Sequence, residues 1–161
     1  MIILARMQDN WNVPELKKEG FMFMFAPKKR IMSELKFTKE HEWIRIEEEE
    51  EERDLAIIGI SNFAQEQLGD IVSIELPKAG GIFRQGQTIA IVDSVKASSD
   101  IYTPISGEIV AVNEELIEKP ELINQSPYDS GWIARIKPSN TEEFENLMTK
   151  EKYDRYIGEI K

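Results

Sequence analysis

The chain has 161 residues, of which 41% are hydrophobic and 31% charged, a length and balance that predict one globular domain. Its formal net charge of -10 disfavours general binding to nucleic-acid phosphates, and no apolar run approaches the ~18 residues that cross a bilayer. The absence of cysteine excludes a disulfide framework, a thiolate metal site and a cysteine nucleophile.

Residues 1–31 differ from the rest of the chain. They hold six basic and three acidic side chains, whereas residues 32–161 hold 14 basic and 27 acidic ones. The apolar run Phe21–Phe25 precedes basic residues, the reverse of a secretory signal, and the acids argue against a mitochondrial presequence. We interpret residues 1–31 as an upstream extension or a misplaced start, with Met32 as the true beginning. A partner-binding or targeting tail is the alternative.

Short strands are predicted at the start of the globular part, residues 32–161. Trp43–Ile46 and Leu55–Ile60 are rich in aromatic and β-branched residues, and the acidic stretch Glu47–Asp54 separates them. The six glutamates of Glu47–Glu52 favour a solvated hairpin loop over a cation site, because cation ligands are spaced along a loop that needs a turn-forming glycine.

A short helix and further strands follow. Ser61 is predicted to cap a helix over Asn62–Leu68, and Gly69 to end it. After a strand-poor stretch at Glu114–Gly131, one last strand is expected. The predicted strands are Ile71–Leu76, Thr88–Asp93, Asp100–Thr103, Glu108–Asn113 and Trp132–Ile136.

Two helices are predicted near the C-terminus. Ser139 and Glu142 have the spacing of a capping box, which indicates a helix near Glu142–Met148. Another helix or turn is expected over Glu151–Ile157.

Two segments share one pattern. Gly69–Ile74 and Gly107–Val112 both consist of glycine, an acid, isoleucine, valine, a variable residue and an aliphatic residue. Two similar half-units predict two small antiparallel sheets packed face to face about a pseudo-twofold axis. The predicted class is therefore mainly β, a flattened barrel or sandwich with short helices, and Ser94–Ser98 would form an exposed hairpin tip between the halves.

The predicted hairpin tip carries Lys96. A side chain at a tight turn points away from the sheet, so a modifying enzyme could reach it and a long arm could swing from it. By position alone, an ordinary solvated lysine is the favoured interpretation of Lys96.

The surrounding residues closely resemble the lipoylation motif of the glycine cleavage H-protein family, Glu-Ser-Val-Lys-Ala. Asp93 to Ala97 differ from that motif only in having aspartate for glutamate, which keeps the charge and shortens the reach. The resemblance covers about residues 35–158, through Thr38–Trp43, Gly59–Asp70, Pro104–Glu108, Val112–Asn113, Pro120–Asn124, Ser126–Tyr128 and Gly131–Trp132. Biotin carriers flank the lysine with methionines, and the lipoyl domains of 2-oxo-acid dehydrogenases lack the His-Glu-Trp opening, so both are secondary interpretations.

The resemblance implies a cofactor carrier with the barrel-sandwich hybrid fold, and no catalytic centre of its own. Lipoate on Lys96 would accept the aminomethyl group left when the P-protein decarboxylates glycine, and would visit the T-protein and the L-protein in turn. A lipoylating enzyme would recognise Asp93, Val95 and Ala97. The implied compartment is the cytoplasm, or the mitochondrial matrix of a eukaryote.

The resemblance also implies a cleft for the loaded arm, which ends in an ammonium group. Glu42 and Asp100 match the family positions that line this cleft, although each could be an ordinary surface carboxylate. His41 is the only histidine and could be a general base, but a structural hydrogen bond beside Trp43 is favoured. Trp43 and Trp132 are expected in the core.

Two alternative functions remain open. A lipoyl donor that passes lipoate to other complexes would also need a modified Lys96. An unlipoylated scaffold would need only the fold, because a fold does not guarantee a function.

Overall fold

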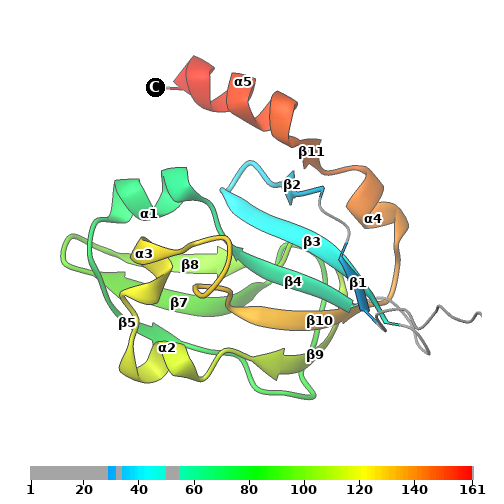
Figure 1. Ribbon diagram of the computed structural model, residues 1–161, viewed down its shortest axis with the longest axis horizontal. Coiled ribbons are helices and arrows are strands. Elements are labelled where there is room, and N and C mark those ends of the chain that lie inside the picture. Colours follow the sequence, from blue (N-terminus) through cyan, green and yellow to red (C-terminus); the bar gives the residue numbers. More distant parts are fainter. Residues whose placement is uncertain (1–28, 32–33, 50–54, 161) are drawn as a thin grey trace, which may run out of the picture. The chain divides into compact units, whose positions relative to one another are not determined.

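Two antiparallel sheets make up most of the structure, a computed structural model that describes residues 29–31, 34–49 and 55–160 (Figure 1). In the larger sheet the strand order is β11-β2-β3-β4-β10-β9-β6, and in the smaller sheet it is β5-β7-β8. This arrangement confirms the predicted mainly β class. The proposed extension, residues 1–31, lies outside the described residues except for β1 (Lys29–Ile31).

The observed strands follow the predicted ones closely. The larger sheet contains β2 (Lys36–Phe37), β3 (Glu42–Glu49), β4 (Leu55–Ile60), β6 (Ile82–Phe83), β9 (Gly107–Val112), β10 (Ala134–Pro138) and β11 (Met148–Thr149). The smaller sheet contains β5 (Ile71–Glu75), β7 (Thr88–Ser94) and β8 (Ser98–Tyr102). The two patterned segments supply β5 and β9, one strand to each sheet, although the sheets differ in size.

Strand β4 lies between two groups of buried side chains. Its inner face joins the main core between the sheets through Ala56, Ile58 and Ile60. The second group consists of Phe37, Trp43, Ile57 and Tyr153. A strand covered on both faces requires a nearly continuous apolar sequence, and residues 55–60 have one.

The Trp43 indole depends on a glycine in the neighbouring strand. Trp43 pairs with Gly59 across β3 and β4, and an added Cβ at Gly59 would lie 2.6 Å from the indole Nε1. The indole is fully buried, and its N–H donates to the Pro127 carbonyl oxygen at 2.9 Å. Since a buried N–H needs an acceptor, Gly59 leaves the space in which Trp43 joins the sheet to the loop at Pro127. The core position predicted for Trp43 is confirmed, whereas Trp132 is only half-buried.

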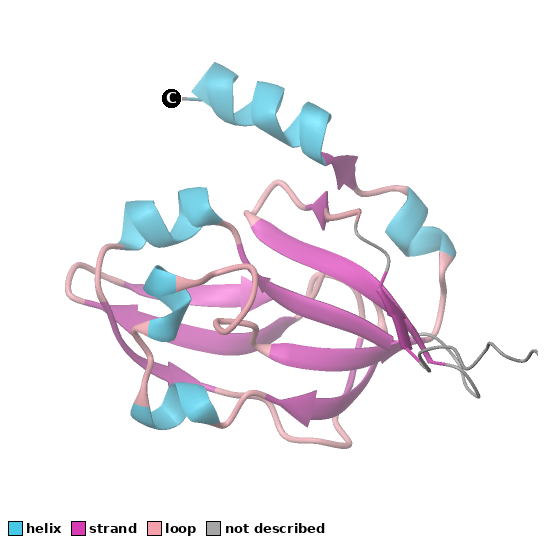
Figure 2. Cartoon of the chain, in the orientation of Figure 1, coloured by secondary structure: helices cyan, strands magenta, loops and turns pink. Residues whose placement is uncertain are grey.

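The helices lie at the periphery of the strands (Figure 2). The prediction of α1 (Asn62–Leu68) is confirmed: the Ser61 hydroxyl accepts the Ala64 amide hydrogen at 3.2 Å, and Gly69 ends the helix with φ of 79°. The others are α2 (Glu115–Glu118), α3 (Leu122–Gln125), α4 (Glu142–Glu145) and α5 (Lys150–Ile160). In the described part of the chain, no helix is long and apolar enough to span a bilayer.

The solvated loop predicted for Glu47–Glu52 is wrong at its first residues. Strand β3 continues to Glu49, and Glu47 is only 4% exposed. Glu47 pairs with Leu55 in β4, and its Oε1 lies 3.7 Å from the Arg135 Nε of β10. Strand pairing and an ion pair therefore outweigh the local charge repulsion. Residues 50–52 lie outside the described residues.

The capping box predicted from Ser139 and Glu142 is also wrong. Helix α4 is a single turn, and the Glu142 amide donates instead to Asn140 Oδ1 at 3.0 Å. The Glu143 carboxylate accepts hydrogen bonds from the Ser106 amide and hydroxyl, at 2.7 and 2.9 Å. Asn140, and not Ser139, therefore accepts the amide hydrogen at the start of α4, and Glu143 in the same turn binds the distant Ser106.

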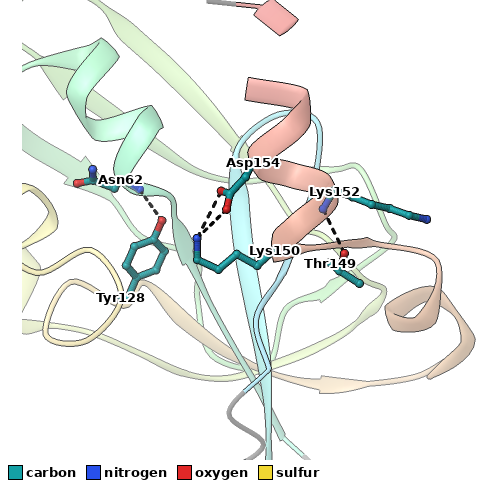
Figure 3. A network of polar contacts seen from close by, with 6 residues as sticks. All are labelled: Asn62, Tyr128, Thr149, Lys150, Lys152 and Asp154. Atoms are coloured by element: carbon teal, nitrogen blue, oxygen red, sulfur yellow. Dashed lines mark hydrogen bonds and ion pairs between the residues drawn. The ribbon is translucent and has the colours of Figure 1, made fainter. Parts of the chain in front are cut away.

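Helix α5 begins with local polar contacts (Figure 3). The Thr149 hydroxyl accepts the Lys152 amide hydrogen at 3.3 Å, and Lys150 pairs with Asp154 one turn later at 3.0 Å. In the same view the Asn62 amide, at the start of α1, donates to the Tyr128 hydroxyl at 2.9 Å.

Two glycine-to-alanine changes should have opposite effects on stability. In Gly107→Ala the new Cβ would lie 2.2 Å from the Lys137 carbonyl oxygen, so the overpacking should cost about 1–3 kcal/mol. In Gly158→Ala, on α5, the Cβ meets nothing within 4 Å and should stabilise by about 0.5–1 kcal/mol. Urea denaturation of both variants checks the prediction, and equal midpoints would contradict it.

Candidate functional site

Lys96 lies at the tip of the hairpin between β7 and β8. The base is closed by the pair Asp93 and Ser98, and the Ser94 amide donates to the Ala97 carbonyl oxygen at 2.8 Å. The Ser94 hydroxyl oxygen accepts the amide hydrogens of Lys96 and Ala97, each at 3.1 Å. The Ser94 side chain therefore satisfies two backbone N–H groups of the turn.

The side chains at the tip face solvent. Val95 is 66% exposed, Lys96 is exposed, and the Lys96 ammonium makes no ion pair with any residue that the structure describes. The Asp93 carboxylate accepts hydrogen bonds from Ser98 at 2.6 Å and from Ser73 at 3.2 Å. Asp93 thus braces the hairpin base through two serine hydroxyls.

A cleft of about 520 Å³ lies beyond the other end of β8. Its wall includes Thr38, Glu42, Gln85, Tyr102, Pro104 and Met148. These residues come from β3 and the turn before it, from the end of β8, and from β11 and the loops. The wall is largely apolar and contains one buried carboxylate, while Lys39 and Glu40 lie at its exposed part with opposite charges. The buried carboxylate suits a partly apolar, cationic group.

Glu42 is that carboxylate, and its expected role toward a loaded arm stays a prediction. It is 2% exposed, and it accepts hydrogen bonds from the Thr38 hydroxyl and from the Tyr102 amide, the latter at 3.0 Å. Burial raises the pKa of Glu42, and the hydrogen bonds from Thr38 and Tyr102 oppose that increase. Sequence reasoning missed Thr38 and Tyr102, although both stand within the matching segments or beside them.

Asp100 does not contribute to the wall of this cleft. It is exposed on β8, opposite Ile91, between the Lys96 tip and Tyr102. From Ser98 to Tyr102, strand β8 extends over about 13 Å. Asp100 therefore lies on β8 between the Lys96 tip and the cleft, and its role toward a loaded arm stays a prediction.

His41 makes a structural contact, the role favoured from its sequence context. It has a left-handed φ of 76°, and its Nδ1 lies 2.8 Å from the Tyr153 hydroxyl. That hydroxyl lies 2.6 Å from the Ser61 hydroxyl, and burial raises the pKa of Tyr153 to about 12. Ser61 is fully buried, so this trio joins α5 to the start of α1 and offers no exposed nucleophile.

The fold and the sequence match one known family. The family model described as "Glycine cleavage H-protein" matches residues 35–160. The glycine cleavage system H protein of Halothermothrix orenii is 45% identical over 130 residues, which cover 81% of this chain and 98% of the relative. The counterpart from Carboxydothermus hydrogenoformans is 44% identical over 129 residues, 80% of this chain and 95% of the relative. A crystal structure of such a protein from Mycobacterium marinum has a TM-score of 0.70 and 32% identity, covering 80% of this chain and 99% of that one.

The buried Glu42 carboxyl predicts a definite pH dependence. Because its pKa is raised above the usual 4.5, its stabilising effect is complete below pH 4.5 and is lost as the pH rises through the folded-state pKa. The stability of the wild type relative to Glu42→Gln should therefore fall with rising pH, by up to ~1.4 kcal/mol per pH unit. Urea denaturation at a series of pH values measures this difference. Glu118→Gln removes an exposed charge as the control, and a pH-independent difference for Glu42→Gln would contradict the prediction.

Proposed function

Because the chain belongs to the glycine cleavage H-protein family, we propose that it is the lipoyl carrier of a glycine cleavage system, with lipoate in amide linkage to Lys96. The observation that carries the assignment to Lys96 is its position, exposed at a braced hairpin tip within the sequence Asp93 to Ala97. A carrier of this kind has no catalytic centre of its own, and its chain binds, presents and protects the group it carries.

The residues at the tip fit a lipoyl group. An amide bond to Nζ requires an accessible amine, and Lys96 is exposed and makes no ion pair with the described residues. The exposed Val95, next to Lys96 in the sequence, offers an apolar surface that a lipoyl chain could contact. When bound, lipoate supplies a disulfide that can accept a carbon group at sulfur and be restored by oxidation. Asp93, Val95 and Ala97 would be read by the lipoylating enzyme.

We assign the cleft to protection of the loaded arm. Glu42 would face its ammonium group, Tyr102 and Met148 would help to exclude water, and Asp100 would attract the cation on its way along β8. The partners would be the glycine-decarboxylating P-protein, the aminomethyl-transferring T-protein and the dihydrolipoyl-oxidising L-protein. The carrier would share the compartment of these partners, which is the cytoplasm, or the mitochondrial matrix in a eukaryote.

Intact mass spectrometry tests the attachment site. Protein made in lipoate-competent cells should be heavier by one lipoyl group, and Lys96→Arg should abolish the increment. Lys78→Arg, which changes another exposed lysine between strands, is the matched control and should keep it. A wild-type chain that stays unmodified in such cells would overturn the proposal and favour an unlipoylated scaffold.

Reconstitution with the P-, T- and L-proteins tests the pathway. The lipoylated wild type should support glycine-dependent release of CO2, and the Lys96→Arg variant should not. A lipoylated chain that supports no CO2 release but passes lipoate to another acceptor would instead identify a lipoyl donor.

Asp100→Ala should release the aminomethyl group several-fold faster, because it removes a carboxylate that attracts the ammonium, and it should leave lipoylation intact. Timed loss of the group from the isolated, loaded protein measures this rate. Asp129→Ala, an exposed aspartate in the loop after α3, is the control. If Asp100→Ala and Asp129→Ala lost the aminomethyl group at equal rates, Asp100 would have no role in holding the loaded arm.

A further inference from the structure

Asn124 uses its side chain to hold a segment that is distant in sequence. It is half-buried on α3, where its neighbour Ile123 is fully buried. Its Nδ2 donates to the Gly69 carbonyl oxygen at 2.9 Å and to Gln65 Oε1 at 2.8 Å. Its Oδ1 accepts the Ile71 amide hydrogen at 2.9 Å. Both ends of the amide are therefore bonded to the junction between α1 and β5.

That junction cannot satisfy its own backbone. Gly69 has left the helix with φ of 79°, and the pairing of β5 with β7 changes register between Ile71 and Ser73. At such an irregularity the ladder leaves some backbone groups unpaired. Asn124 binds the Gly69 carbonyl and the Ile71 amide, one on each side of Asp70, and thereby fixes the direction of the Asp70 carbonyl.

The Asp70 carbonyl in turn holds the hairpin tip. It accepts the Val95 amide hydrogen at 3.0 Å. A Cβ added to Gly69 would lie 3.4 Å from Lys96 Cε and 3.6 Å from Val95 Cγ2, so the stem of the lysine runs beside the same junction. Residues 69–71 thus form the support beneath both tip residues.

We propose that Asn124 is a positioning residue for the modification of Lys96. By holding residues 69–71, it keeps the tip in the geometry that the lipoylating enzyme recognises, although it touches neither Lys96 nor the reacting atoms. This inference rests on the proposed lipoylation of Lys96.

Asn113 provides a matched control. Its Nδ2 also donates to two backbone carbonyl oxygens, those of Ser130 and Trp132, both at 2.8 Å, and it is 5% exposed. Its bonds join the end of β9 to the chain before β10 and do not reach residues 69–71. Asn113→Ala therefore removes two donated hydrogen bonds, as many as Asn124 donates, without disturbing the support of the hairpin.

The test uses the full, unlipoylated chain in wild-type, Asn124→Ala and Asn113→Ala forms. Amide hydrogen exchange at Val95 should accelerate about tenfold in Asn124→Ala, the size expected for one weakened hydrogen bond, and should be unchanged in Asn113→Ala. With a lipoylating enzyme, the KM for Asn124→Ala should rise by a similar factor while kcat stays near the wild-type value. Asn113→Ala should keep both constants.

Should Asn124→Ala fail to fold, Asn124→Asp serves, because it keeps the acceptor for Ile71 and loses both donated bonds. A folded variant whose Val95 exchange and KM match those of Asn113→Ala would overturn the inference. A wild-type chain that the enzyme does not modify would instead overturn the proposed function and the link to modification. Exchange at Val95 would then still decide whether Asn124 holds the tip.

Discussion

The aliphatic core between the two sheets determines where the hairpin tip falls. Ile89, Ala90 and Val92 of β7 and Ile101 of β8 are buried, while Lys96 between them is exposed. Ala90, Val92 and Ile101 lie on one face of the sheet, and a slip of one residue in the pairing would turn them away from the core, so their burial fixes the register of β7 and β8. The exposed position of Lys96 is therefore a consequence of burial elsewhere on the same two strands.

Strand β8 also connects the Lys96 tip with the cleft, the two parts of the proposed site. One end follows the Lys96 turn, and at the other end the Tyr102 amide donates to Glu42. A carboxyl side chain thus satisfies a backbone group at the edge of the smaller sheet, where no further strand pairs with β8 among the described residues. The same contact places a carboxylate inside the cleft, so the end of the sheet and the lining of the cleft are built by one interaction.

Local features of the sequence predicted the local structure well. The Ser61 cap, the Gly69 stop and the strands around Lys96 depend on neighbouring residues, and all were found, although β8 begins at Ser98, two residues before the predicted start. Two predictions failed: Glu47 lies near the distant Arg135, and the Glu142 amide donates to Asn140 where a capping box with Ser139 was expected. Glu42 and Asp100 came from family resemblance, because nothing in their local sequence indicates a shared route or cleft.

Asn124 was missed for the same physical reason. Its bonds to Gly69 and Ile71 cross more than 50 residues, and no periodicity reports such a contact. The segment Pro120–Asn124 was noticed only because it matches the family. An asparagine in a one-turn helix, next to a buried isoleucine, does not by itself indicate a positioning role. That role becomes visible only when its backbone hydrogen-bond partners are known.

The contact between Trp43 and Gly59 makes the residue tolerated at each position depend on the residue at the other. The indole occupies the space that a side chain on Gly59 would need, and its N–H donates a hydrogen bond to the Pro127 carbonyl oxygen. A larger residue at 59 becomes tolerable only if residue 43 shrinks, and a smaller residue at 43 leaves Pro127 without its donor. The two positions thus share one volume, and related sequences should vary them together or keep both.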